Sequence, residues 1–128
     1  MRAEGESMVD QQDLKIRTKQ FALRIIRLYT SLPKTTEAQV MGKQVLRSGT
    51  SVGAQYREAQ RAKSDADFIN KAEGSLQELD ETSYWLELLK DSGIISCEKL
   101  TPLLKETDEL IAIFVTIVKK VKSKRIYS

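Results

Sequence analysis

The sequence predicts an all-α protein, a single domain folded as an up-down-up-down antiparallel four-helix bundle. Its 128 residues include only six glycines and two prolines, too few for a protein built from many short strands and turns. Apolar residues instead recur at three- and four-residue steps in four segments, which is the spacing of amphipathic helices. Short polar loops separate these segments, and long helices joined by short loops pack as antiparallel neighbours.

The first two helices are delimited by the proline-containing loop between them. The spacing predicts a first helix over about Gln12 to Ser31, because a proline follows and ends the pattern. Thr35 or Thr36 is expected to cap the second helix, which should reach Ala62 or Lys63. The predicted core positions are Leu14, Phe21, Ile25, Leu28 and Leu32 in the first helix and Val45, Gly49, Val52, Tyr56 and Ala59 in the second.

The third and fourth helices are separated by a glycine-containing loop. Ser64 should open the third helix, with two aspartates in its first turn, and Gly93 should end it. The fourth helix is expected to start after Ser96, with Pro102 delaying its regular part by one turn. The predicted core positions are Phe68, Ala72, Ser75, Leu79, Thr82, Leu86 and Leu89, then Leu100, Leu103, Thr107, Leu110, Phe114, Ile117 and Val121.

A second apolar row runs along the fourth helix, made of Leu104, Ile111, Val115 and Val118. A bundle helix needs an apolar stripe of about three positions in seven, so this helix has more than one core face requires. The row is either a broader core face or a further buried contact, and the second interpretation makes self-association a hypothesis.

The two ends of the chain differ from its middle. Residues 1–12 are predicted to be disordered, residues 13–122 to form the bundle, and residues 123–128 to form a basic tail. The first twelve residues have no apolar run, so no signal peptide is expected, and no segment is long enough to span a bilayer. The single cysteine, Cys97, fits a reducing compartment. These features together predict a cytoplasmic protein.

The residue types that most enzymes use are scarce. The chain contains no histidine, which removes the commonest general base and the usual His-containing metal sites. We therefore expect no catalytic residues, no metal and no cofactor. Arg47 of the second helix could pair with Glu78 or Glu81 of the third, or these carboxylates could simply be solvated.

Residues 44–62 read QVLRSGTSVGAQYREAQRA and raise the question of a phosphate-binding loop. A Walker loop needs a glycine five residues before a Gly-Lys pair, and the only Gly-Lys pair, at Gly42, lacks it. As a helix, the segment carries Gly49 and Gly53 on nearby turns, each costing about 1 kcal/mol relative to alanine. Close approach of a neighbouring helix is the expected compensation.

Three segments carry a family resemblance: LRSGTSVGAQYREA at 46–59, SDADFI at 64–69 and LQELDETSYWLELL at 76–89. They resemble the four-helix-bundle proteins encoded within intervening sequences of bacterial 23S ribosomal RNA genes, over about Phe21 to Lys120. The matching positions are Arg47, Ser48, Ser51, Gly53, Glu58, Ala59, Ser64, Phe68, Glu78, Glu81, Trp85 and Leu86. Gln55 replaces a usual Asn, and Gly74-Ser75 replaces an Ala-containing pair.

The resemblance implies an up-down-up-down bundle that assembles as a homopentamer. It brings no catalytic residues. A related branch, the accessory proteins of diversity-generating retroelements, binds nucleic acid and a reverse transcriptase. The resemblance therefore makes nucleic acid, a reverse transcriptase or another protein, and further copies of this chain the candidate partners, with no membrane among them.

Charge is distributed unevenly along the chain, whose formal net charge is +3. Residues 14–34 hold six basic residues and no acid, whereas residues 73–109 hold ten acids and three lysines. The predicted topology gathers many cations at one end of the bundle. These are Lys15, Arg17, Lys19, Arg57, Arg61, Lys63, Lys119, Lys120, Lys122, Lys124 and Arg125.

Clustered cations are typical of phosphate-backbone binding, although cations near a helix C-terminus can also simply balance the helix dipole. The sequence favours a non-enzymatic, oligomeric nucleic-acid-binding protein that contacts RNA or DNA backbone. The alternative is a protein-interaction scaffold that docks a partner such as a reverse transcriptase.

Overall fold

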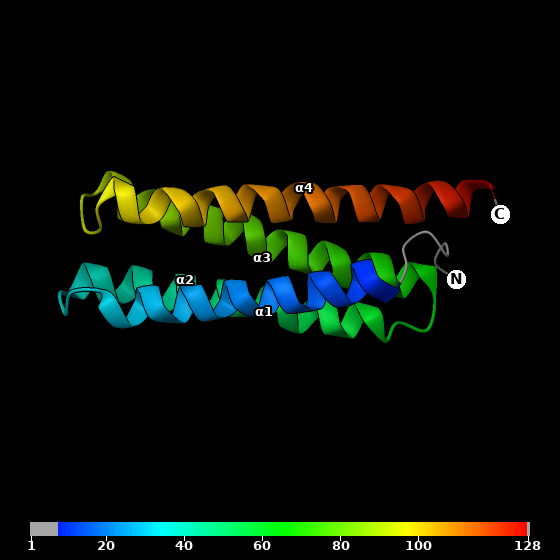
Figure 1. Cartoon of the computed structure of the whole chain (residues 1–128), viewed down its shortest axis with the longest axis horizontal. Helices are drawn as coiled ribbons and strands as arrows, with labels where there is room; N and C mark the ends of the chain where they lie inside the picture. Colours follow the sequence, from blue (N-terminus) through cyan, green and yellow to red (C-terminus); the bar gives the residue numbers. More distant parts are fainter. Residues whose placement is uncertain (1–7, 128) are drawn as a thin grey trace.

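The structure is a computed structural model that describes the backbone of residues 8–127 and the side chains of residues 12–124. Four helices follow one another: α1 (Met8–Ser31), α2 (Thr36–Gln60), α3 (Asp65–Asp91) and α4 (Cys97–Tyr127). They run up, down, up and down, with the start of α1, the α2–α3 loop and the end of α4 at one end of the molecule (Figure 1). The predicted all-α bundle is confirmed.

The first and last helices, α1 and α4, are both longer than predicted. α1 begins at Met8, inside the segment expected to be disordered, while residues 1–7 lie outside the described part of the chain. α4 continues to Tyr127, so the segment expected to form a separate tail is helical as far as that residue. Neither extension contains glycine or proline, and nothing in them interrupts a helix already formed.

Two interior boundaries also differ from expectation. α2 ends at Gln60 rather than at Ala62 or Lys63, because Ser64 is extended (φ −154°, ψ 165°) to cap α3 and the preceding residues form the loop. Pro102 lies inside α4 and does not delay it. This proline is exposed and lies in the second turn of the helix, where it removes the one amide hydrogen bond that would reach back to the carbonyl of Glu98.

The predicted caps are present at the starts of α2 and α3. Thr35 Oγ1 accepts a hydrogen bond from the amide of Ala38 at 3.4 Å, and Ser64 Oγ accepts one from the amide of Asp67 at 3.1 Å. Each such cap stabilises its helix by about 1 kcal/mol. After α3, Gly93 adopts φ +77°, a left-handed conformation that favours glycine.

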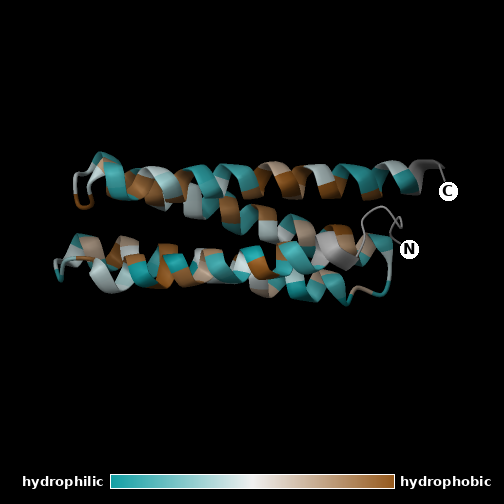
Figure 2. Cartoon of the chain, in the orientation of Figure 1, coloured by the Kyte–Doolittle hydropathy of each residue, from teal (hydrophilic) through white to brown (hydrophobic). Residues whose placement is uncertain are grey.

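The core fills the space between the four helices. Each helix packs closely on the next in sequence: α1 on α2, α2 on α3, and α3 on α4. The rings of Tyr56 and Phe114, both buried, meet edge to face with centroids 5.6 Å apart. Hydrophobic and hydrophilic residues alternate along all four ribbons (Figure 2), as amphipathic helices require.

The predicted core positions are buried with two exceptions, Leu28 and Ile117, which are half-buried. Val118 from the second row of α4 is buried instead, and Leu104 and Ile111 pack half-buried against the core. The structure therefore places most of that row on a broad core face. No helix in the described residues has the length and apolarity needed to cross a bilayer.

The α1–α2 contact explains the two glycines in the middle of α2. A Cβ added at Gly49 would lie 2.7 Å from Cγ1 of Ile25, and one at Gly53 would lie 3.1 Å from Oγ1 of Thr18. Both neighbours belong to α1 and are buried. The expected close approach of another helix is therefore confirmed.

Candidate functional site

The basic residues predicted at one end divide into two groups. The first, called the α2 group, lies on α1, the end of α2 and the following loop; the second, called the α4 group, lies on the last turns of α4. α2 and α4 reach this end of the bundle on different sides of it (Figure 1). The α2 group contains Lys15, Lys19, Arg57, Arg61 and Lys63; the α4 group contains Lys119, Lys120, Lys122 and Lys124.

Most of these cations face solvent. Lys15 and Lys124 are half-buried and the other members of both groups are exposed. The side chain of Arg125 lies outside the described residues. Asp65 and Asp67, in the first turn of α3, share this end of the bundle, so its field is positive without being uniform.

Arg17 serves a different purpose from the other predicted cations. Its Nε and Nη2 donate to the carboxylate of Glu106 at 2.8 and 2.7 Å, and Nη2 also donates to Glu109 at 3.0 Å. The hydrogen bond to Glu106 is the main reason that the pKa of Arg17 is raised above its ordinary value. With two acids neutralising it, this guanidinium links α1 to α4 and adds little to the open basic surface.

Two further pairs lie near the same end. Lys122 Nζ donates to Glu73 at 3.1 Å, and Lys71 Nζ donates to Glu58 at 3.0 Å. The second hydrogen bond raises the pKa of Lys71. Exposed pairs of this kind add little to stability because solvent screens them, so Lys122 remains accessible to a stronger anionic partner. Within the described residues, no ion pair engages Lys15, Lys19, Arg57, Arg61, Lys63, Lys119 or Lys124.

The motif positions of α2 and α3 form a polar network across the two helices. Arg47 Nη1 donates to Glu78 at 3.2 Å, and its Nη2 donates to Glu81 at 2.6 Å. Gln55 Nε2 donates to the same Glu78 carboxylate at 3.3 Å. Of the two alternatives that the sequence left open, the ion pair is present, and one arginine bridges both glutamates. Because Arg47 is half exposed, the network fixes the pairing of the helices more than it adds stability.

Below this network lies a buried row of hydroxyls. Thr82 Oγ1 is 2.8 Å from Ser48 Oγ and donates to the carbonyl of Glu78 at 2.7 Å. Ser75 Oγ donates to the carbonyl of Val52, on α2, at 2.9 Å. Ser48, Ser75 and Thr82 are fully buried. Such bonds between helices set their axial register, since a shift of either helix would leave buried hydroxyls unpaired.

Three other motif residues have local roles. Ser51 Oγ donates to the carbonyl of Arg47, one turn earlier in α2, at 2.7 Å. The half-buried Trp85 packs edge to face on Tyr84 with ring centroids 5.3 Å apart. Its Nε1 is the one buried side-chain nitrogen or oxygen in the described residues that lacks a hydrogen-bond partner. Glu58 pairs with Lys71 as stated above.

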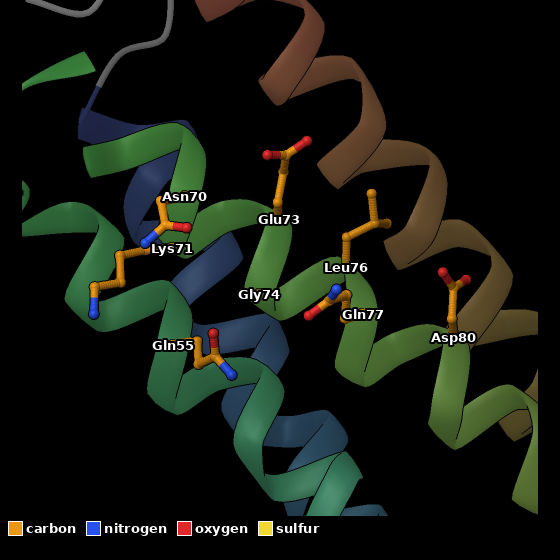
Figure 3. A pocket seen from close by; sticks show the side chains of 8 residues that line it. All are labelled: Gln55, Asn70, Lys71, Glu73, Gly74, Leu76, Gln77 and Asp80. Carbon is orange, nitrogen blue, oxygen red and sulfur yellow. The ribbon is translucent and has the colours of Figure 1, made fainter. Parts of the chain in front are cut away.

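Gln55 and Gly74, the two departures from the family pattern that the sequence indicated, are sterically compatible with each other. A Cβ at Gly74 would collide with Oε1 of Gln55, which lies on α2 beside Gly74 of α3 (Figure 3). Asn is one methylene shorter than Gln, so the longer side chain at position 55 occupies the space that alanine would fill at position 74. The surrounding surface is an open pocket of about 500 Å³ lined mainly by polar groups, including Asn70, Gln77 and Asp80.

Sequence reasoning missed two of these arrangements. It predicted Ser75 and Thr82 as core positions without seeing that their hydroxyls bond to α2. It also counted Arg17 among the cations available to a nucleic acid and did not pair it with Glu106 and Glu109, which lie three residues apart on one face of α4. That acidic pair, opposite a run of basic residues in α1, was the available signal. In the described part of the chain, no three Cys, Asp or Glu side chains are grouped closely enough to hold a metal ion.

Comparison with known proteins agrees with this architecture. A solved structure from Bacteroides thetaiotaomicron, a protein of unknown function from the S23 ribosomal protein family, superposes with a TM-score of 0.80. It shares 42% sequence identity over 85% of this chain and 97% of its own. A search of curated proteins gave no significant match. The profile of the 23S rRNA-intervening sequence protein family matches residues 11–116. The chain belongs to the 23S rRNA-intervening sequence protein family.

Proposed function

We propose that this protein is a non-enzymatic, oligomeric nucleic-acid-binding protein that contacts the backbone of RNA or DNA through the α2 and α4 groups. The observation that carries the proposal is the set of seven cations at one end that have no ion-pair partner among the described residues. Cations without such partners at one end create a local positive potential, which attracts polyanions.

The proposal predicts a binding mode with little sequence preference. Lysine and arginine contacts to phosphates position a nucleic acid without reading its bases. Neutralising phosphates releases counterions, so affinity should fall steeply as salt rises. The two groups lie on different sides of one end, so a duplex or folded RNA laid across that end would meet both.

The second candidate function is a scaffold that docks another protein, such as a reverse transcriptase. It is favoured by the opposite charge of α3, whose exposed acids include Asp80, Glu87 and Asp91. A surface with separate acidic and basic regions suits an electrostatically complementary protein. Unlike nucleic-acid binding, this function does not require affinity for a bare polyanion.

Charge reversal separates the two functions. One variant replaces Lys119, Lys120, Lys122 and Lys124 of the α4 group by Glu. Its matched control replaces Lys34, Lys43, Lys99 and Lys105, all exposed and away from that end of the bundle, also by Glu. Both variants change the net charge by the same amount, so any difference in binding between them reflects position.

The measurement is the affinity for a structured RNA as a function of salt, with circular dichroism to check helical content. We expect the α4-group variant to lose at least tenfold in affinity at low salt and to show a flatter salt slope, while the control loses less. Equal affinity in both variants and the parent, or no binding by the parent at low salt, contradicts the proposal and leaves the scaffold function.

A further inference from the structure

The open pocket beside Gly74 lies in the half of the bundle nearer the α2 and α4 groups. Its volume is about 500 Å³, and one of its lining residues, Gln55, comes from α2 while the others come from α3 (Figure 3). Pockets for apolar ligands are lined predominantly by hydrophobic side chains, whereas amide and charged groups dominate this one. A ligand that suits it is a polar group that both donates and accepts hydrogen bonds.

Three of the lining side chains have hydrogen-bonding groups to spare. Asn70, Gln77 and Asp80 are exposed, and within the described residues no hydrogen bond or ion pair engages their side chains. Each amide offers N–H donors and a carbonyl acceptor, and the carboxylate offers acceptors alone. The pocket therefore presents donors and acceptors side by side, together with one acid that has no counter-charge.

The pocket also adjoins the proposed nucleic-acid surface. The side chains of Glu73, Leu76 and Asp80 point toward α4 (Figure 3), and Glu73 accepts a hydrogen bond from Lys122 of the α4 group at 3.1 Å. Lys119 lies one turn before Lys122 on α4. Because Glu73 both lines the pocket and contacts Lys122, a phosphate held by Lys122 would lie at the edge of the pocket.

We propose that this pocket takes one unpaired nucleobase of an RNA whose neighbouring phosphates lie on the α4 group. A paired base inside an RNA helix is hard to read, whereas a bulged base can leave the stack and be hydrogen-bonded on its edges. The half-buried Leu76 offers an apolar contact to the flat face of such a base. The inference rests on the proposed function, and it adds recognition at one unpaired position to a contact that is otherwise independent of sequence.

The free groups of the pocket also favour particular bases. Asn and Gln side chains pair bidentately with adenine, and a carboxylate accepts from the amino group of cytosine. Adenine and cytosine each carry an amino group next to a ring nitrogen that accepts, and uracil has no amino group. Asn70, Gln77 and Asp80 should therefore bind adenine or cytosine in preference to uracil.

Four RNA hairpins with the same stem test the site. One is fully paired, and the other three carry a single unpaired adenine, cytosine or uracil at the same position. Affinities at low salt are measured for the full chain, for the pocket variant Asn70→Ala with Gln77→Ala, and for a matched control, Gln20→Ala with Gln44→Ala. The control removes exposed amides of α1 and α2 that lie outside the pocket. Alanine favours helix, and circular dichroism checks that each variant is folded.

We expect the parent and the control to bind the adenine or cytosine bulge at least about fivefold more tightly than the uracil bulge or the paired hairpin, as a bidentate base contact would give. The pocket variant should lose this preference and bind the paired hairpin as the parent does. Binding by the parent without preference, or a pocket variant that keeps the preference, overturns the base pocket alone. A parent that binds none of the hairpins overturns the proposed function and the pocket with it.

Discussion

Alanine at each of three helical glycines should have three different effects on stability, because the glycines face different obstacles. In a helix, alanine is favoured over glycine by about 1 kcal/mol. At Gly49 the new Cβ would lie 2.7 Å from Cγ1 of Ile25, whereas ordinary contacts begin at 3.4 Å. Ile25 must therefore retreat by about 0.7 Å in a fully buried site.

Ile25 has little freedom to make that retreat. It is β-branched, which leaves one strongly preferred χ1 rotamer in a helix, and it is 0% exposed. Overpacking of this kind costs about 1–3 kcal/mol, which exceeds the gain in propensity. We expect Gly49→Ala to destabilise the protein by up to about 2 kcal/mol. Gly53→Ala should be near neutral, because its tightest contact, with Thr18 Oγ1, is 3.1 Å.

Gly74→Ala should instead be stabilising. The only obstacle is the end of the flexible Gln55 side chain, which can rotate away at the loss of one long hydrogen bond to Glu78. The net gain should be about 0.5–1 kcal/mol, or a rise of a few degrees in melting temperature. Thermal unfolding by circular dichroism should rank the variants Gly74→Ala, Gly53→Ala, Gly49→Ala from most to least stable. If Gly49→Ala equals or exceeds Gly74→Ala, the close-approach argument is wrong.

Two further substitutions test specific contacts by chemical denaturation. Thr82→Val keeps the shape of the side chain but removes the hydroxyl that bonds Ser48 and the Glu78 carbonyl, so it should lower the free energy of unfolding by about 1–2 kcal/mol. The control Thr116→Val, on the exposed face of α4, should change it by under about 0.5 kcal/mol. Equal effects of the two substitutions would contradict the role assigned to Thr82. Arg17→Lys keeps the charge but loses the planar guanidinium that reaches Glu106 and Glu109 together, so it should lower the free energy of unfolding by about 1 kcal/mol. Arg27 has no such partners among the described residues, and Arg27→Lys should leave the free energy of unfolding unchanged.

The fold could be predicted because its signals are local. Caps at Thr35 and Ser64, the glycine that ends α3, and the three-four stepping of apolar residues all act within a few positions of where they appear. The helix ends were predicted less well, because a chain end without a breaker carries no positive signal for where a helix stops. α1 and α4 accordingly extended further than expected.

The candidate site was predicted only in outline. Topology alone brought the cations of α1, α2 and α4 to one end, and that much follows from the order of helices. Which cations are paired depends on side-chain reach across the bundle. Arg17 and Glu106 are 89 residues apart in sequence, and no periodicity within one helix reports that they meet. The mutual fit of Gln55 and Gly74 is hidden for the same reason.

The contact between α1 and α4 is weaker than the contacts between consecutive helices. Consecutive helices approach one another backbone to backbone, but α1 and α4 are not among those close pairs, and their described polar link is the side chain of Arg17. Side-chain links can lengthen or break without disturbing a backbone contact. Local opening should therefore begin between the first and last helices, while α2 and α3, tied by buried hydroxyls, stay together as the most protected unit of the fold.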